Sequence, residues 1–190
     1  MTRIQKIALA GAAALALGLG AISTAPSSAE ETKMVGGAAM YPSKNIVQNA
    51  VNSKDHTTLV AAVKAAGLVS TLEGPGPFTV FAPTNAAFAK LPKGTVEMLL
   101  KPENKDKLAG ILTYHVVAGT MTTKDLREKI KAGGGKAELK TVEGKPLTIT
   151  EKDGHVWLTD EKGDKAEITI ANVMQSNGVI QVINTVMLPG

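Results

Sequence analysis

Three histidines are the side chains of this chain best suited to bind a metal or to transfer protons, because its 190 residues include no cysteine. His56, His115 and His155 are too far apart in sequence to form a local metal-binding pair such as His-x-x-x-His. The lack of cysteine excludes a disulfide, a thiolate metal site and a cysteine nucleophile. No Gly-x-Ser-x-Gly segment, typical of serine hydrolases, occurs either. We therefore expect no metal site, no cofactor and no catalytic set of residues.

Two polar segments resemble ligand sites only superficially. The run 133–136 reads Gly-Gly-Gly-Lys, but a phosphate-binding loop would also need glycine at 130 and serine or threonine at 137, where Ile130 and Ala137 stand. A glycine stop after a helix is the better interpretation. The acidic run 160–164 lacks the spacing of oxygen ligands that a calcium loop requires, and it fits a solvated hairpin turn.

His115 differs from the other two histidines because apolar residues flank it on both sides. Residues 111–112 precede it on a predicted helix, and residues 116–117 follow it on a predicted strand. Such a histidine is expected to be at least half buried, and a buried imidazole needs hydrogen-bond partners. It is either a structural residue that ties the helix end to the sheet or, together with Tyr114, part of a binding surface.

The first 29 residues have the pattern of a secretory signal peptide. Arg3 and Lys6 precede an apolar run at 7–22, and small residues lead to Ala29. The apolar run has 16 residues. A membrane-spanning helix needs about 20, so cleavage after Ala29 is favoured over an uncleaved anchor. The sequence therefore predicts a signal peptide at 1–29 and a secreted or periplasmic protein with no stable membrane span.

The charge of the chain gives little support for a nucleic-acid partner. Its formal net charge is +4, and two of the basic residues lie in the predicted signal peptide. In the remaining chain lysines alternate with acids, and aromatic residues make up only 3% of the sequence. Neither a basic stripe nor a surface for stacking bases is expected, so we predict no nucleic-acid binding.

Periodicity divides the rest of the chain into a short tail and one domain. Residues 30–42 show no periodicity and are expected to form a flexible N-terminal tail, followed by a single domain at 43–190. A helix-rich first part followed by a strand-rich second part predicts an α+β fold. Apolar spacing predicts helices at 46–51, 56–66, 85–88, 104–113 and 122–130. Gly67 is expected to end the second of these helices, and Thr122 or Thr123 to cap the last. The β-type runs are at 78–82, 137–142, 147–150, 155–158, 168–171, 179–183 and 186–188.

Three segments together resemble the fasciclin-like domain family. Residues 76–88 resemble its first box, residues 112–117 its central Tyr-His segment, and residues 176–189 its second box. Their order and spacing cover nearly all of the predicted domain. The box residues with structural roles are Phe78, Phe81, Pro83, Thr84, Asn85, Phe88, Asn177, Gly178, Gln181 and Asn184.

The resemblance implies a fold and a kind of function. It implies a wedge-shaped β-sandwich with several helices packed in the N-terminal half, and a secreted, non-catalytic module that binds a cell-surface or matrix protein or a glycan. The Tyr-His region of animal members has been linked to integrin binding, which by position would give a binding role to Tyr114 and His115. Gln181 and Asn184 replace a histidine and an aspartate usual in the family, so these positions keep hydrogen bonding but lose titration.

Two other functions remain open on the sequence alone. A periplasmic small-ligand protein could hold a lipid or a tetrapyrrole in an apolar groove, near His115 or a methionine, although methionines more often fill a core. The four methionines considered are Met98, Met121, Met174 and Met187. A hydrolase is a third alternative, and it lacks a recognisable nucleophile and base. The oligomeric state is left open.

Overall fold

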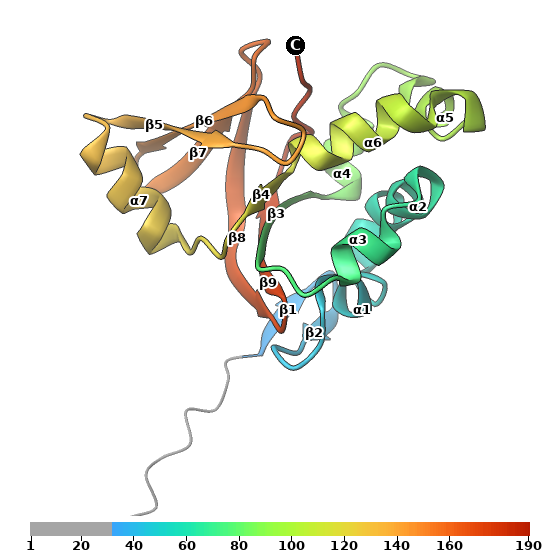
Figure 1. Cartoon of the computed structure of the whole chain (residues 1–190), viewed down its shortest axis with the longest axis horizontal. Coiled ribbons are helices and arrows are strands. Elements are labelled where there is room, and N and C mark those ends of the chain that lie inside the picture. The colour runs from blue at the N-terminus through green and yellow to red at the C-terminus, as the bar shows by residue number, and fades with distance from the viewer. Residues whose placement is uncertain (1–31) are drawn as a thin grey trace, which may run out of the picture.

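The computed structural model describes residues 32–190, so the predicted signal peptide at 1–29 lies outside the described residues. Figure 1 shows short helices gathered on one side of a curved sheet, with one further helix on the opposite side. The helices come mostly from the first part of the chain and the strands from the second. The predicted α+β class, with helices in the N-terminal half, is confirmed.

The segment predicted as a flexible tail at 30–42 is instead largely a β-hairpin. Strand β1 (Lys33–Val35) pairs antiparallel with β2 (Ala38–Met40). Val35 and Met40 are buried and belong to the hydrophobic core. The prediction was wrong here because two three-residue strands are too short to show a periodic pattern, although each contributes one core side chain.

Most predicted helices are confirmed, and their ends follow the expected capping rules. Gly67 ends the second helix in the left-handed conformation, with φ of 71°, which glycine adopts without a steric penalty. The third and fifth helices and the two 3₁₀ turns were not predicted. The elements are α1 (Ile46–Ala50), η1 (Lys54–His56), α2 (Thr57–Ala66), α3 (Val69–Glu73), α4 (Asn85–Ala89), α5 (Thr95–Leu99), η2 (Pro102–Asn104), α6 (Lys105–Tyr114) and α7 (Thr123–Ala132).

The main sheet of the described chain has seven strands in the order β4-β3-β9-β8-β7-β6-β5. Only β3 and β9 run parallel to each other, with Val80 opposite Ile180, and every other neighbouring pair is antiparallel. The strands are β3 (Phe78–Pro83), β4 (Val116–Ala118), β5 (Lys136–Lys140), β6 (Pro146–Lys152), β7 (His155–Thr159), β8 (Lys165–Gln175) and β9 (Gly178–Ile183).

The sheet folds back on itself through the long strand β8. Its pairing with β9 shifts register twice between Ile168 and Val173, and Asn172 has a positive φ of 55°. Such irregularities bend a strand. At the far ends of the sheet an isolated bridge joins Val117, on β4, to Thr141, just after β5. The two ends of the sheet therefore meet, and this gives the predicted wedge shape.

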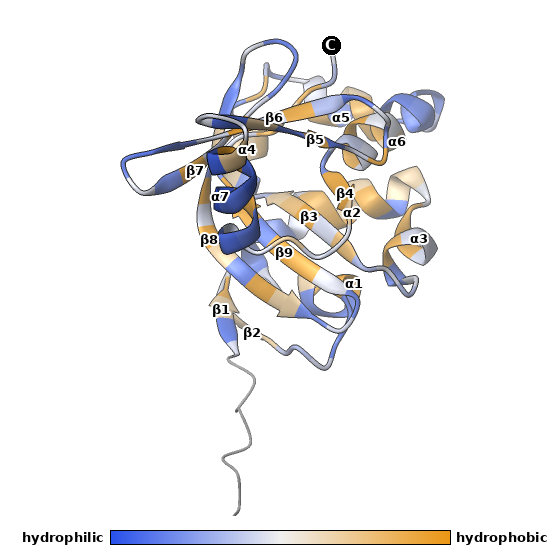
Figure 2. Cartoon of the chain, turned by 60° about the vertical axis from the view of Figure 1, so that its left-hand side comes forward, coloured by the Kyte–Doolittle hydropathy of each residue, from blue (hydrophilic) through white to orange (hydrophobic). Residues whose placement is uncertain are grey.

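Two hydrophobic cores flank the central strands. One lies between the helices α1–α6 and one face of β3 and β9, and the other lies inside the folded sheet. Helix α7 closes the second core with Leu126 and Ile130 and leaves its polar face outward. Figure 2 shows this contrast between hydrophobic β3 and β9 and a mainly hydrophilic α7. Within residues 32–190, none of the helices combines the length and the apolar character needed to cross a membrane.

Candidate functional site

His115 lies where α6 ends and β4 begins, and both of its ring nitrogens are engaged. Its Nε2 atom is 3.0 Å from the backbone nitrogen of Met187, and its Nδ1 atom is 2.8 Å from the carbonyl oxygen of Ile111. The Met187 N–H can only donate, so Nε2 must be the acceptor. The ring proton is therefore on Nδ1, from which it is donated to Ile111. This tautomer makes His115 a neutral connector between a helix end and the C-terminal segment.

Burial keeps His115 in this neutral form. Only 2% of the residue is exposed. Loss of solvation lowers its pKa from 6.5 to about 4, although the Ile111 carbonyl and the negative charge of Asp160 favour the protonated form. With both nitrogens occupied, His115 has no lone pair free for a metal ion or a proton transfer. The geometry thus favours the structural interpretation of this histidine.

Tyr114 is fully buried beside His115. Its hydroxyl donates a hydrogen bond of 2.9 Å to the carbonyl oxygen of Pro146, at the start of β6. Burial raises the pKa of Tyr114 to about 12, and the charge of Asp160 adds to this effect. Neither Tyr114 nor His115 offers surface to a partner, so a binding role for the pair would act through the surface that they support, and it stays a prediction.

The surface above these two residues is formed by a set of loops that we call the loop platform: residues 141–145, 160–164 and 188–190. The first loop is attached directly to the Tyr-His segment. The Val142 N–H donates to the Val116 carbonyl at 2.7 Å, and the Glu143 N–H donates to the Thr113 carbonyl at 3.4 Å. Residues on both sides of the buried pair therefore position this loop.

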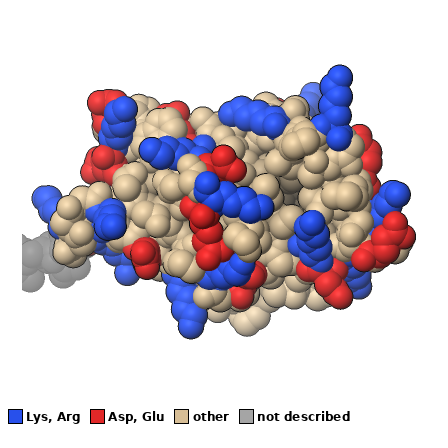
Figure 3. Space-filling model, turned by 90° about the horizontal axis from the view of Figure 1, so that it is seen from above, with Lys and Arg blue, Asp and Glu red and all other residues tan. Residues whose placement is uncertain are grey.

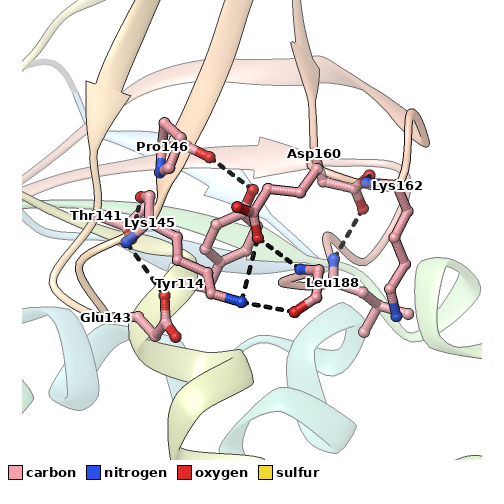
Figure 4. Close-up of polar contacts among 10 residues, drawn as sticks. Tyr114, Thr141, Glu143, Lys145, Pro146, Asp160, Lys162 and Leu188 are labelled. Carbon is pink, nitrogen blue, oxygen red and sulfur yellow. Dashed lines mark hydrogen bonds and ion pairs between the residues drawn. The ribbon is translucent and has the colours of Figure 1, made fainter.

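Asp160 organises the second loop of the platform and is itself buried. Its Oδ1 atom accepts hydrogen bonds from the backbone N–H groups of Lys162 at 3.0 Å and Asp164 at 2.9 Å. Its Oδ2 atom accepts from the Leu188 N–H at 2.9 Å. One carboxylate thus closes the turn between β7 and β8 and holds the C-terminal segment against it (Figure 4). The predicted hairpin turn at 160–164 is confirmed.

An ion pair joins the first two loops of the platform. The Lys145 ammonium lies 3.3 Å from the Glu161 carboxylate and donates to the Gly190 carbonyl at 2.6 Å. The Gly190 N–H donates to the same carboxylate at 2.6 Å. This N–H, and next the ammonium of Lys145, lower the pKa of Glu161. Figure 4 shows Lys145 reaching across from its loop toward these groups.

The platform presents both signs of charge beside an apolar side chain. Val142 is one of the larger exposed hydrophobic residues, at 48% exposure. Figure 3 views the molecule from above, which is the side of the C-terminus in Figure 1. On this face acidic and basic side chains are interspersed rather than separated. The sequence did not reveal this surface, because it depends on the folding back of the sheet. A Thr-Val-Glu-Gly-Lys turn has no functional signature of its own.

Asn177 and Gly178 of the second box are buried where β8 turns into β9. The Asn177 side chain accepts from the Ile46 N–H at 3.0 Å and donates to the carbonyl oxygens of Leu72 and Gly74 at 2.8 and 2.9 Å. It thereby links the β8–β9 turn to α1 and α3. Gly178 faces the backbone of Phe78 so closely that a Cβ atom there would collide with the Phe78 carbonyl oxygen.

Gln181 and Asn184 form neutral bonds at the positions where the family usually has titratable residues. The Gln181 side chain accepts from the Asn172 N–H at 2.8 Å and donates to the Met121 carbonyl at 2.9 Å. The Asn184 side chain accepts from the Glu167 N–H at 3.0 Å. Neither contacts His115 through a hydrogen bond in the described residues, so these side chains form no acid–base pair with it.

The first box consists of a strand, a cap and a connector. Strand β3 ends with Pro83, which lies opposite Ile183 of β9. Thr84 caps α4 by accepting from the Ala87 N–H at 3.3 Å. The Asn85 side chain bridges to the η1–α2 segment by accepting from Thr58 N–H and donating to the Lys54 carbonyl. Phe81 and Phe88 are buried, and Phe78 packs against the helical core.

The remaining histidines do not form a site together. His155 is exposed, and its Nδ1 atom is 2.8 Å from the Glu167 carboxylate. His56 is buried, and its Nδ1 atom is 2.9 Å from the Ser53 hydroxyl. Over residues 32–190, no three histidine, cysteine, aspartate or glutamate side chains are grouped so as to hold a metal ion.

These observations define the class of protein: a small α+β domain in which the prominent polar side chains hold the backbone together. Residues 54–189 match the family model described as Fasciclin domain. The chain therefore belongs to the fasciclin domain family, as its three boxes predicted.

Two relatives and one solved structure illustrate the similarity. Protein sll1483 of Synechocystis sp. is 46% identical over 99% of this chain and 98% of its own length. The cell surface glycolipoprotein MPB83 of Mycobacterium bovis is 32% identical over 98% of this chain and 78% of its own. The fold resembles a FAS1 domain pair from the insect cell adhesion molecule Fasciclin I, with a TM-score of 0.69 at 18% identity. That match covers 76% of this chain and 51% of the pair.

Proposed function

We propose that the protein is a non-catalytic interaction module of the cell surface, which binds a surface or matrix protein or a glycan. Fasciclin domains are in general non-catalytic adhesion modules, and this family membership is the main support. Two of the similar proteins agree with such a role, because one is a cell surface glycolipoprotein and the other is a cell adhesion molecule. The proposal includes export, with a signal peptide at 1–29 removed after Ala29, and no nucleic-acid partner.

The loop platform is the contact surface that the geometry supports best. It combines the exposed Val142 with the Lys145–Glu161 pair, and apolar and charged groups side by side are what a protein or glycan contact uses. Tyr114 and His115 contribute by holding the loops in place from below. The binding role that the family resemblance implies for the pair is thereby indirect: they position a surface and do not touch the partner.

Two valines allow a matched test of this surface. Val142 on the platform and Val51 at the end of α1 are each 48% exposed. Retention of the exported protein on envelopes of its host is measured for Val142→Asp and Val51→Asp. We expect Val142→Asp to weaken retention about tenfold, as for a central interface residue, while Val51→Asp leaves it unchanged. The melting temperatures of both variants serve as the folding control.

Two results would contradict the proposal. The first is retention of the unmodified protein that does not exceed that of an unrelated exported protein. The second is an equal loss of retention in the two valine variants, because the platform would then have no special role.

A further inference from the structure

A narrow apolar slot lies between the helices and the sheet. The central strands β3 and β9 separate it from the core inside the folded sheet. The slot runs from the β1–β2 hairpin at one end to Val142 at the other. Helices α1, α2 and α3 form one wall, and β3, β4 and β9 form the other. Its lining is almost entirely hydrocarbon, and representative lining residues are Val35, Val63, Leu72, Phe78, Val80 and Ile180.

The slot is long but has little volume. Its enclosed space is about 70 Å³, whereas an engineered cavity that binds benzene has about 150 Å³. A tetrapyrrole, which is far larger than benzene, therefore does not fit the enclosed space. The lining residues extend from the β1–β2 hairpin to Val142, so this small volume is spread along the slot. Such a space suits a linear hydrocarbon chain better than a compact group. Of the two ligand classes raised by the sequence, the slot is compatible with the lipid alone.

The rim of the slot is suited to an amphiphile. Val60, Leu68 and Val69 border it and are only half buried, so a hydrocarbon chain could enter between α2 and α3. Lys64 also borders it and is exposed. It is the one lysine or arginine that borders the slot within the described chain, and its ammonium group suits a carboxylate headgroup at the mouth.

The interior of the slot carries no charge. His56 and His115 border it, and burial lowers the pKa of each, so both are neutral at pH 7. The Nε2 atom of His56 is buried and makes no hydrogen bond with the described residues. A neutral lining favours an apolar tail over a charged or strongly hydrated group.

We infer that the slot binds a single unbranched hydrocarbon chain with an anionic headgroup, as in a fatty acid. The tail lies between α2 and the sheet, and the carboxylate lies at Lys64. Because the enclosed volume admits only a few carbon atoms, the rest of the tail lies along the open rim between Val60 and Val69. This binding does not depend on the proposed adhesion role.

The first test compares a linear carboxylate ligand with a compact, cage-shaped one of similar carbon number. The purified protein is titrated with decanoate and with adamantane-1-carboxylate, followed by calorimetry and by methyl NMR. We expect binding of decanoate, with shifts confined to slot residues such as Val63, Leu72 and Ile180, and no binding of the cage. Failure to bind decanoate at millimolar concentration, or equal binding of both compounds, would overturn the inference.

Two pairs of variants locate the ligand. Ala50 lines the slot, whereas Ala109 on α6 is similarly half buried but lies outside it. We expect Ala50→Leu to weaken decanoate binding about tenfold and Ala109→Leu to leave it unchanged. Lys64→Gln, at an exposed position that cannot prevent folding, is expected to weaken decanoate binding about threefold and to spare 1-decanol.

The outcomes separate this inference from the adhesion role. Equal effects of Ala50→Leu and Ala109→Leu, with both variants folded, would place the ligand elsewhere. An equal effect of Lys64→Gln on the binding of decanoate and of 1-decanol would show that Lys64 does not bind the carboxylate headgroup. Since no envelope partner is present in these titrations, their failure leaves the platform untouched, and Ala50→Leu should retain full envelope binding.

Discussion

The Nε2 atom of His115 accepts a hydrogen bond of 3.0 Å from the backbone N–H of Met187, a residue 72 positions further along the chain. This bond explains why residues 186–188 do not form the strand that their β-branched and apolar composition predicted. The Met187 N–H is used by a side chain instead of a neighbouring strand. The same bond requires a neutral imidazole, which makes the stability of the domain sensitive to acid.

The stability of the folded domain should fall as the pH drops from 6.5 toward 4. The unfolded chain protonates His115 near its ordinary pKa of 6.5, whereas the folded chain does so only at about 4. A depressed histidine pKa therefore leaves stability intact above pH 6.5 and removes it as the pH falls. The loss is on the order of 3 kcal/mol across this interval.

Urea unfolding at a series of pH values checks this expectation, with His115→Gln as the control. Glutamine does not titrate, so the difference in unfolding free energy between the two proteins should shrink as the pH falls. His56, whose pKa burial also lowers, acts alike in both proteins and cancels in the difference. A difference that stays constant from pH 7 to pH 4 would show that His115 is not held neutral.

Removing the hydroxyl of Tyr114 should destabilise the domain. In Tyr114→Phe the Pro146 carbonyl loses its hydrogen-bond donor in a partly buried position, which costs about 0.5–1.5 kcal/mol. Tyr41 is exposed and its hydroxyl makes no hydrogen bond within residues 32–190, so Tyr41→Phe is the matched control. Chemical denaturation of the two variants measures the difference, and equal midpoints would contradict the role assigned to the Tyr114 hydroxyl.

Two glycine substitutions should have opposite effects. In Gly178→Ala the new methyl group would collide with the Phe78 backbone in the pairing of β3 with β9, so we expect a loss of more than about 3 kcal/mol or failure to fold. In Gly110→Ala the methyl group meets open space on α6, and the gain in helix propensity should stabilise by about 0.5–1 kcal/mol. Thermal melts of both proteins suffice, and a well-folded Gly178→Ala variant would refute the close approach.

Locally determined parts of the fold could be predicted from the sequence. The apolar neighbours of His115 predicted its burial, Gly67 predicted the end of α2, and the threonine at 122 caps α7 as expected. In each case the signal and the structure that it determines lie within one turn of helix or one strand. The family boxes added the order of these elements.

Features that depend on the curvature of the sheet could not be predicted. The Lys145–Glu161 pair forms only because the β5–β6 and β7–β8 turns lie at the same end of the wedge. The hairpin containing Val35 and Met40 was missed because its strands are too short for a periodic signal. The slot likewise results from the packing of three helices on three strands, and no single segment encodes it.

In the function proposed above, Tyr114 and His115 support the loop platform from inside without touching the partner. Envelope retention measured together with the melting temperature, for Val142→Asp and Tyr114→Phe, tests it most directly. We predict that Val142→Asp loses retention at an unchanged melting temperature, while Tyr114→Phe melts earlier but is retained normally well below its melting point. Loss of retention in Tyr114→Phe at an unchanged melting temperature would contradict the claim, because the tyrosine would then contact the partner itself.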